Sequence, residues 1–160
     1  MAPGDDLHLR EMKAGEVEEL LRMIVDVFEE VSVAKNTVDR FGPLNGHGWE
    51  VAKADAAGED IGRADVVLIG EIGGRIAAMT TIKYDRKFSI GHIGHMAVAR
   101  EYQGRGHGRR MLRAAIDRMR ADGIRYSSID ALEQNPRAER LYKSEGFTEV
   151  ARKIMMFRPL

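Results

Sequence analysis

The 160-residue chain has no cysteine and no excess of charge of either sign. The absence of cysteine excludes disulfide bonds, metal sites with cysteine ligands and a covalent acyl-cysteine intermediate. Lysine plus arginine and aspartate plus glutamate each number 25, so the formal net charge is zero. Such a chain has no overall field that would draw it to nucleic acid or to a membrane surface, and any anion site must be local.

Long apolar runs are also missing. No apolar stretch approaches the roughly 20 residues that span a bilayer, and residues 1–6 lack the positive charge and the apolar run of a signal peptide. A content of 44% hydrophobic and 31% charged residues is typical of a globular protein. We therefore expect one domain over 1–160, a cytoplasmic location, and neither nucleic acid nor a membrane as a partner.

The spacing of apolar and β-branched residues predicts an α/β chain with a mixed sheet. In order, the predicted elements are a strand over 7–12, a helix over 15–31, strands over 65–71, 75–84 and 88–98, a helix over 107–121, a strand over 124–130, a helix from 136 to 146, and final strands over 147–151 and 153–157. Gly73-Gly74 signals a two-residue hairpin turn between antiparallel strands. The helix over 107–121 connects two strands as a βαβ unit, so those strands should be parallel.

Residues 36–64 show no pattern that we can assign. The segment Phe41–Trp49 is rich in glycine and contains the only tryptophan, and a short helix over 50–57 is compatible with the sequence. A long irregular insert in a compact domain is often a binding loop or a lid, but a mobile surface loop would have the same composition. Both interpretations stay open at this point.

The segment Val98–Arg110 is the most informative part of the sequence. It joins a predicted strand to a predicted helix, and glycines alternate at 104, 106 and 108. Glycine lets the backbone turn tightly and approach a ligand closely. The first amides of the helix have no partner within it and lie at the positive end of its dipole, so we predict an anion site, usually one for phosphate.

Four arginines crowd the start of this predicted helix: Arg105, Arg109, Arg110 and Arg113. Cations at this end oppose the helix dipole, at a cost of roughly 0.3–1 kcal/mol each when they are exposed. A bound polyanion would reverse that cost, whereas a solvated basic helix face would need no ligand. The loop is neither a Walker A loop nor a dinucleotide fingerprint, because the Gly-Lys-Ser/Thr of the first and the third glycine of the second are missing.

Two segments resemble motifs of the GNAT superfamily of N-acetyltransferases. Gln103–Gly108 matches Gln/Arg-x-x-Gly-x-Gly/Ala, the acyl-CoA pyrophosphate loop of that superfamily. Asn135–Phe147 resembles its Asn-x-x-Ala-x-x-Leu-Tyr-x-x-x-Gly-Phe segment and lies at the expected distance along the chain. The resemblance covers residues 65–158 well and residues 7–35 in pattern only.

The resemblance implies a fold, a cofactor and a reaction. The fold is a mixed, mostly antiparallel sheet flanked by helices and splayed between the strands near 90–98 and 124–130, where acyl-CoA enters. The reaction is transfer of an acetyl group from acetyl-CoA to a primary amine by direct attack in a ternary complex, without a metal. The residues implied in binding acetyl-CoA are Met96, Ala97, Val98, Gln103, Gly104, Arg105, Gly106, His107, Gly108, Arg109, Asn135, Ala138 and Tyr142.

Two of these residues have a second interpretation. Tyr142 matches the tyrosine that points at the CoA sulfur in the superfamily, and a phenol with an ordinary pKa near 10 can protonate the leaving thiolate. Its ring could instead serve only to pack the helix. Asn135 matches a position that commonly binds the pantetheine arm, but it could equally cap the helix that begins at Pro136.

The general base is the least certain residue of the predicted site. Many relatives carry a carboxylate three or four residues before the position of Val98, where this chain has Gly94 and His95. Histidine ordinarily titrates near neutral pH, so His95 is the candidate base. Alternation places it on the strand face of Ile93 and Ala97. The weaker candidates are Glu133, Asp130 and Glu29, and relay through water is an alternative to all of them.

The sequence does not specify the acceptor amine. In the superfamily the acceptor meets the first helix and the segment after it, so we predict that Phe28, Phe41, His47 and Trp49 border the acceptor. An alternative function is a non-catalytic acyl-CoA-binding or sensing domain of the same fold, and a nucleotide-binding protein is a third. A homodimer is common in the superfamily, but the sequence leaves the oligomeric state open.

Overall fold

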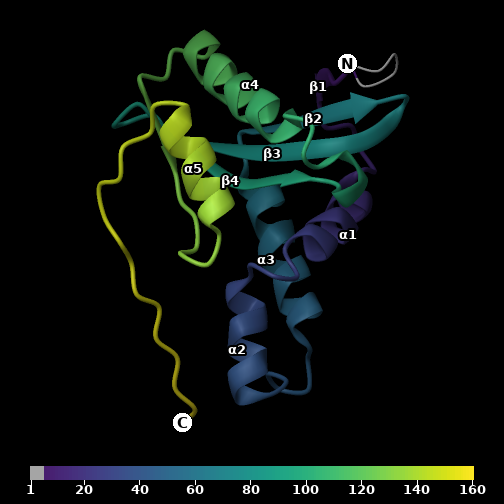
Figure 1. Ribbon diagram of the computed structural model, residues 1–160, viewed down its shortest axis with the longest axis vertical. Helices are drawn as coiled ribbons and strands as arrows, with labels where there is room; N and C mark the ends of the chain where they lie inside the picture. Colours follow the sequence, from purple (N-terminus) through teal and green to yellow (C-terminus); the bar gives the residue numbers. More distant parts are fainter. Residues whose placement is uncertain (1–5) are drawn as a thin grey trace.

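The computed structural model describes residues 6–160, and its centre is one five-stranded sheet with helices on both faces (Figure 1). The strands are β1 (His8–Glu11), β2 (Val66–Ile72), β3 (Arg75–Asp85), β4 (Ile90–Val98) and β5 (Tyr126–Ile129). They lie in the sheet in chain order. β1 to β4 pair antiparallel and β5 pairs parallel to β4, which confirms the predicted mixed, mostly antiparallel sheet.

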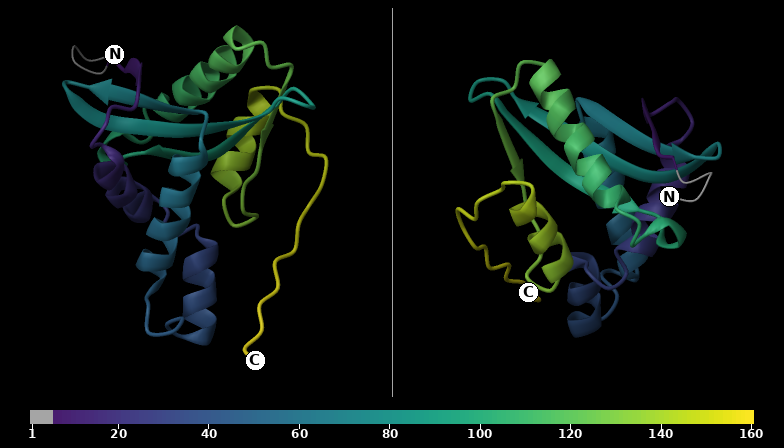
Figure 2. Two further views of the ribbon diagram at one scale, coloured as in Figure 1. Left: turned by 180° about the vertical axis from the view of Figure 1, so that it is seen from behind. Right: turned by 45° about the horizontal axis from the view of Figure 1, so that its top comes forward.

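The helices form two groups around this sheet. They are α1 (Val17–Val27), α2 (Val33–Phe41), α3 (Trp49–Arg63), α4 (His107–Ala121) and α5 (Pro136–Ser144), with a 3-10 helix over Arg100–Tyr102. α4 and α5 lie on one face, α1 and α3 lie on the other, and α2 packs beside α3 away from the sheet (Figures 1 and 2). None of the described helices combines the length and the apolar character that crossing a membrane requires.

Each face of the sheet has its own apolar cluster. The α4-side cluster contains Leu7, Val66, Leu68, Ile72, Ala77, Ala78, Ile82, Ile93, Met111, Leu112, Ala115, Met119 and Ile124. The α1–α3-side cluster contains Leu20, Ile24, Ala57, Ile61, Val67, Ile69, Met79 and Ala97. Neighbouring residues of a strand point to opposite faces, and both faces are covered by helices. The central strands are therefore apolar on both sides.

The structure confirms the βαβ unit predicted from the glycine-rich segment. α4 spans the residues that its apolar stripe predicts, and it connects β4 to the parallel strand β5. The β4–β5 pairing runs only from Ile90–Tyr126 to Ile93–Ile129. Within residues 6–160, the segment 94–98 of β4 therefore has no strand partner on its β5 side. The sheet opens at this point, where the resemblance places the acyl-CoA cleft.

The prediction of a long irregular insert over 36–64 is wrong. α2 and α3 occupy most of this segment as an antiparallel pair joined by residues 42–48 (Figure 1). α3 also extends well beyond the helix predicted over 50–57. Its buried residues are only Ala57 and Ile61, and so narrow an apolar stripe gives little helical periodicity to detect.

The helix predicted over 15–31 is shorter than its apolar pattern. α1 ends at Val27, and Phe28 is its C-cap residue. Ser32 then starts α2, because its side chain accepts a hydrogen bond from the Lys35 amide at 3.4 Å. Serine at this position satisfies a helix amide that would otherwise lack a partner. The apolar pattern continues past the end of α1, so it does not mark where this helix ends.

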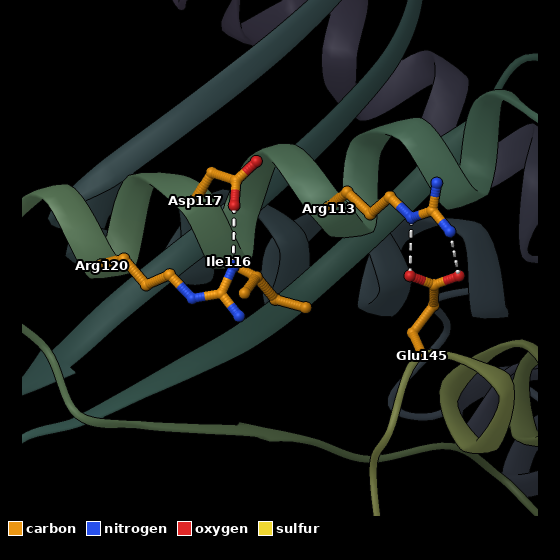
Figure 3. A pocket seen from close by; sticks show the side chains of 5 residues that line it. All are labelled: Arg113, Ile116, Asp117, Arg120 and Glu145. Atoms are coloured by element: carbon orange, nitrogen blue, oxygen red, sulfur yellow. Dashed lines mark hydrogen bonds and ion pairs between the residues drawn. The ribbon is translucent and has the colours of Figure 1, made fainter.

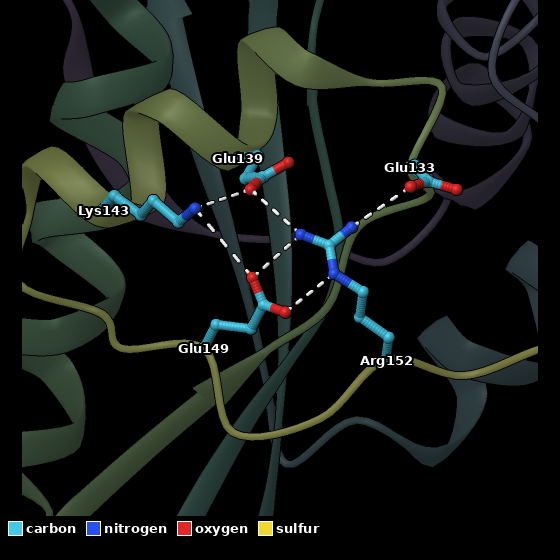
Figure 4. Close-up of polar contacts among 5 residues, drawn as sticks. All are labelled: Glu133, Glu139, Lys143, Glu149 and Arg152. Carbon is cyan, nitrogen blue, oxygen red and sulfur yellow. Dashed lines mark hydrogen bonds and ion pairs between the residues drawn. The ribbon is translucent and has the colours of Figure 1, made fainter.

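The final strands predicted over 147–151 and 153–157 do not form, and residues 147–160 have no regular secondary structure. The segment runs past α5 toward the end of the molecule that holds α2 (Figure 1). Ion pairs fasten its first part to α5 and to the loop before it (Figure 4). They join Glu149 to Lys143, and Arg152 to Glu133, Glu139 and Glu149. Side chains thus hold this segment, and its backbone pairs with no strand of the sheet.

Leu112→Ala is expected to lower the free energy of unfolding by about 2–5 kcal/mol. Leu112 is fully buried in the α4-side cluster, so truncation removes apolar contacts and leaves a cavity. Urea denaturation measures the change. The matched control is Val51→Ala on α3, whose side chain is 45% exposed and whose truncation should cost no more than about 0.5 kcal/mol. Equal effects of the two substitutions would contradict the assignment of the core.

Candidate active site

A β-bulge in β4 directs the His95 side chain. The register passes from the pair Thr80–Met96 to the pair Ile82–Ile93. Thr81 of β3 therefore faces two residues of β4, Gly94 and His95. A bulge of this kind re-aims side chains and interrupts the ladder. The His95 amide accordingly donates to side chains, to the Thr81 hydroxyl at 2.9 Å and to Asp60 Oδ2 at 3.2 Å.

The bulge changes which residues share a strand face. Ile93 belongs to the α4-side cluster, whereas Ala97 belongs to the α1–α3-side cluster. The His95 ring contacts residues of α1 and α3, so it shares a face with Ala97, as predicted. It does not share a face with Ile93. That part of the prediction is wrong, because strict alternation fails where one extra residue is inserted.

Asp60, His95 and Lys53 form a chain of hydrogen bonds on this face. His95 Nδ1 lies 2.7 Å from Asp60 Oδ2, and His95 Nε2 lies 3.0 Å from Lys53 Nζ. A carboxylate can only accept, so Nδ1 carries the ring proton, and the lone pair on Nε2 accepts from Lys53. The imidazole is thus held as the tautomer whose Nε2 can take up a proton.

Phe28, the C-cap residue of α1, completes this cluster. Its ring meets the His95 ring edge-on, with centroids 5.8 Å apart, and Lys53 Nζ lies 4.2 Å from its centroid. The structure therefore brings together Phe28 and His95, two of the predicted site residues. The side chains of His95 and Asp60 are 17% and 27% exposed, so the cluster is shielded from bulk water without being sealed.

The surroundings shift the pKa values of Lys53 and Asp60. Burial lowers the pKa of Lys53, and the Asp60 carboxylate offsets part of that effect. Burial alone would raise the pKa of Asp60, but hydrogen bonds from His95 and Thr81 outweigh it and hold the pKa below its ordinary value. Asp60 therefore stays ionised at neutral pH, and Lys53 loses its proton more readily than an exposed lysine.

Asp60 is a functional candidate that the sequence did not reveal. A Cβ atom at Gly94 would lie 2.6 Å from Asp60 Oδ1 and 2.7 Å from Thr81 Oγ1. The Asp60 carboxylate on α3 thus fills the space that a side chain at position 94 would need. This position is one of the two at which the resemblance led us to expect a carboxylate. A glycine inside a predicted strand was the only signal in the sequence that something else occupies this space.

The glycine-rich loop has the geometry of an anion site. Gly104 and Gly106 have φ values of 78° and 83°, which other residues rarely adopt. Gly106 is the N-cap residue of α4. The amides of Gly106, His107 and Gly108 donate to no backbone acceptor within residues 6–160. Three successive amides at the positive end of a 15-residue helix can therefore bind an anion.

The two motif segments meet beside this loop. Gln103 Nε2 donates to the Val98 carbonyl at 2.9 Å, which ties the loop to the end of β4. A Cβ atom at Gly108 would lie 3.7 Å from Leu141 on α5 and 3.9 Å from Val98. α4, α5 and β4 thus converge around Gly108, where a Cβ atom would make ordinary van der Waals contacts with both neighbours.

His107 lies beneath the loop and not on its surface. Its side chain is buried, at 3% exposure, and neither ring nitrogen has a hydrogen-bond partner within residues 6–160. The ring is thus shielded from a ligand outside the loop. A contribution of His107 to anion binding would come from its backbone amide.

Carboxylates of the protein already pair with most of the arginines at the start of α4. Arg109 and Arg113 both pair with Glu145, whose side chain is only 8% exposed, and Arg110 pairs with Asp6 at 3.1 Å. Figure 3 shows Arg113 and Glu145 at one end of a shallow cavity of about 240 Å³ along α4. These arginines therefore do not by themselves require a bound polyanion. The case for an anion site rests on the loop amides.

α5 presents Asn135 and Tyr142 on the α4 side of the sheet. Asn135 caps the helix, because its side chain accepts from the Ala138 amide at 3.2 Å. This is the structural role weighed from the sequence, and Nδ2 stays available for a pantetheine contact. The Tyr142 ring packs against the α4-side cluster near Phe147, at a centroid distance of 6.2 Å.

The Tyr142 hydroxyl is suited to keep its proton. Burial, with a smaller effect from the Asp130 carboxylate, raises the pKa of Tyr142 to about 12. The hydroxyl makes no hydrogen bond to another residue in the described part of the chain. It is therefore free to donate to a ligand.

The other predicted acceptor residues lie elsewhere. Phe41 ends α2, His47 lies in the connection, and Trp49 begins α3, so all three lie at the end of the helix pair remote from the sheet (Figure 1). Phe41 packs on Phe157 with ring centroids 5.0 Å apart. The structure does not bring this group next to His95, and its contact with an acceptor stays a prediction.

Two of the weaker base candidates are engaged in ion pairs. Glu29 pairs with Arg100 at 3.2 Å, and Glu133 pairs with Arg152 at 3.2 Å. Asp130 follows β5 and acts on Tyr142 through its charge. No group of three or more His, Asp or Glu side chains within residues 6–160 gathers as metal ligands would. His95 is the candidate base with the best-defined orientation.

The sequence profile of the Acetyltransferase (GNAT) family matches residues 34–147. This span includes both motif segments and the Asp60–His95–Lys53 cluster. No curated protein matches the sequence.

Several solved structures share the fold. A transcriptional regulator from Bacillus halodurans C-125 matches with a TM-score of 0.67 and 19% identity, over 96% of this chain and 100% of that chain. Aminoglycoside N-acetyltransferase AAC(6′)-Iy in complex with CoA matches with a TM-score of 0.65 and 17% identity, over 100% and 99% of the two chains. For the ribosomal-protein-S18-alanine N-acetyltransferase from Escherichia coli the TM-score is 0.65 and the identity 19%, over 91% and 80%. Identities this low establish the fold and leave the acceptor open.

Proposed function

Because the chain belongs to the acetyltransferase (GNAT) family, we propose that it transfers an acetyl group from acetyl-CoA to a primary amine by direct attack in a ternary complex. The observation that carries the proposal is the opening of the sheet at residues 94–98 of β4, with the loop amides at one end and the His95 cluster at the other. The CoA complex of the aminoglycoside N-acetyltransferase, which shares the fold, supports acetyl-CoA as the co-substrate.

In this proposal the free amides of Gly106, His107 and Gly108 bind the pyrophosphate of acetyl-CoA. The pantetheine arm lies along β4, where its amides can pair with the unpartnered edge at Met96, Ala97 and Val98. The arm then brings the thioester toward Tyr142, and a backbone amide near Ala97 binds the carbonyl oxygen.

The chemistry needs a base, an oxyanion site and a proton for the leaving group. His95 Nε2 accepts the proton of the attacking amine, and Asp60 is a positioning residue that fixes the tautomer and stabilises the resulting imidazolium. The Tyr142 hydroxyl donates to the thiolate, because its pKa of about 12 keeps it protonated at neutral pH. No covalent enzyme intermediate is required.

Incubation with acetyl-CoA and a panel of amines tests this function. The panel should include small metabolites, peptides, protein N-termini and aminoglycosides, because the structure does not select among these classes. Free thiol and acetylated product are followed together by colorimetry and mass spectrometry. We expect amine-dependent thiol release that continues for many turnovers.

The alternative is a non-catalytic acyl-CoA sensor with the same fold. The free Tyr142 hydroxyl favours the enzyme, since a sensor has no need of a thiolate partner. Tight CoA binding without turnover on any amine would establish the sensor. ATP competing with CoA at similar affinity would instead favour a nucleotide-binding protein.

Trp49→Ala separates two roles of the α2–α3 connection. If Trp49 borders the acceptor, as we propose, the substitution raises the acceptor KM and spares CoA affinity and the melting temperature. An anchoring role predicts a melting temperature lower by several degrees and weaker use of both substrates. Steady-state kinetics and a thermal melt on the same preparation distinguish the two. Because the α2–α3 connection lies remote from the sheet, Trp49 can contact the acceptor only if the acceptor is large.

A further inference from the structure

The amine of Lys53 lies where the proposed reaction places the acceptor amine. In that reaction His95 Nε2 removes the proton of the acceptor, and Lys53 Nζ lies 3.0 Å from this same atom. Nε2 has one lone pair, so it accepts from one N–H at a time. An external amine must therefore displace Lys53, or Lys53 must itself be the acceptor.

The surroundings position the Lys53 amine beside the base and lower its pKa. Its nitrogen lies 4.2 Å from the centre of the Phe28 ring, which fixes the end of a side chain that is otherwise flexible. Burial lowers its pKa, so more of the amine is neutral than in an exposed lysine. The cluster thus has the three parts of an activated nucleophile: Lys53, the base His95 and the orienting carboxylate of Asp60.

A purely structural role accounts less well for this arrangement. An ion pair with Asp60 would place the ammonium against the carboxylate, but Lys53 donates to the imidazole instead, and Thr81 and His95 supply the hydrogen bonds to Asp60 Oδ2. Lys53 lies two turns before Asp60 on α3, and its side chain reaches His95 of β4.

Resting on the proposed function, we infer that the protein acetylates its own Lys53 when acetyl-CoA is bound and no external acceptor is present. The Lys53 nitrogen attacks the thioester carbonyl carbon, and an N–C bond forms as the C–S bond breaks. His95 Nε2 takes the amine proton and passes it to water. The thiolate takes a proton from Tyr142, which regains one from water, and CoA leaves as the free thiol.

The product is an amide, which the site has no means to transfer further. Acetylated Lys53 is therefore an end state and not an intermediate. It places an acetyl group against His95 where an acceptor amine would bind, so the modification should slow amine turnover. Acceptor amines that displace Lys53 from His95 should protect Lys53 from acetylation.

Tryptic mapping after incubation with acetyl-CoA alone tests the inference. Trypsin cleaves after Arg40, Lys53 and Arg63 but not after acetyl-lysine, so modification converts two peptides, 41–53 and 54–63, into one, 41–63. Lys87 is exposed in the β3–β4 turn and reports uncatalysed acetylation in the same sample. We expect Lys53 to be modified at least about tenfold faster than Lys87, at a rate independent of protein concentration.

His95→Gln is the matched variant, because glutamine can hydrogen-bond within the cluster but cannot take up the proton. It should slow Lys53 acetylation about 100-fold and leave Lys87 unchanged. Circular dichroism checks that the variant folds. If the variant does not fold, the ratio of the Lys53 to the Lys87 acetylation rate in the unaltered protein still tests the inference.

The outcomes separate this inference from the proposed function. Amine-dependent thiol release with Lys53 modified no faster than Lys87 overturns the inference and leaves the enzyme function standing. CoA binding with neither amine nor Lys53 acetylated overturns the inference and establishes the sensor. Absence of acetyl-CoA binding overturns both. A Lys53 rate that rises with protein concentration overturns modification within one molecule.

Discussion

Tyr142→Phe is expected to lower kcat by about 10- to 1,000-fold while leaving the affinity for CoA nearly unchanged. The substitution keeps the ring in its place against the α4-side cluster and removes only the hydroxyl. That hydroxyl donates to no protein group in residues 6–160, so its loss leaves no buried partner unsatisfied. The expected effect is therefore on the departure of the thiolate and not on folding. Single-turnover kinetics and calorimetric titration with CoA measure the two quantities.

The pH dependence gives an independent check on this role. Because the pKa of Tyr142 is raised to about 12, the protonated form persists from about pH 7 to about pH 10. The unaltered enzyme should therefore show no alkaline loss of rate from this group in that range. Tyr142→Phe should reduce the rate by a similar factor throughout. An unchanged rate, with the chemical step limiting, would make Tyr142 a packing residue only.

Gly106→Asp is expected to abolish measurable CoA binding. Gly106 is the N-cap residue of α4 and has a φ of 83°, and no atom lies within 4 Å of the position that its Cβ would take. A carboxylate there would lie beside the free amides of the loop and could accept from them in place of the pyrophosphate. It would also repel the pyrophosphate, so competition and Coulomb repulsion act together. Calorimetric titration with CoA measures the loss.

Gly106→Asn is the matched control for this substitution. Asparagine has the size of aspartate, carries no charge and tolerates positive φ better than most residues. Comparison of the two variants isolates the effect of the charge, because both introduce a side chain of the same size at the same positive φ. We expect Gly106→Asn to weaken CoA binding less than Gly106→Asp, with both variants folded. Retention of full CoA affinity by Gly106→Asp would show that the pyrophosphate binds elsewhere.

The sequence predicted the part of the fold in which local signals agree. In the βαβ unit, α4 has a clear apolar stripe, a glycine turn before it and Asp122-Gly123 after it, and this helix has the bounds predicted, whereas both strands are shorter than predicted. The β2–β3 hairpin follows from Gly73-Gly74, both with positive φ. α2 was missed, and only residues 50–57 of α3 were considered as a helix, because α2 has no buried residue and α3 has only two. The final strands were predicted from propensity alone, and propensity does not supply a strand for them to pair with.

Motif spacing can predict a site only where its residues lie within one segment. The loop and α5 residues are contiguous in the sequence, so motif spacing predicts them, and their contacts with acetyl-CoA stay predictions. The Asp60–His95 pair joins residues 35 apart, and Asp60 lies on the part of α3 beyond the helix considered over 50–57. The β4 bulge is set by pairing with Thr81 across the sheet, and alternation along one strand cannot show it. The positioning carboxylate therefore required the three-dimensional structure.

The most direct test of the proposed acetyl transfer is a crystal structure of the protein with acetyl-CoA or CoA bound. We expect the pyrophosphate on the amides of Gly106, His107 and Gly108, and the pantetheine along the unpartnered edge of β4. The sulfur should lie within about 3–3.5 Å of the Tyr142 hydroxyl, with the His95 cluster on the acceptor side. A pyrophosphate bound in the α4 cavity lined by Arg113 and Arg120, with the sulfur remote from Tyr142, would contradict the proposal.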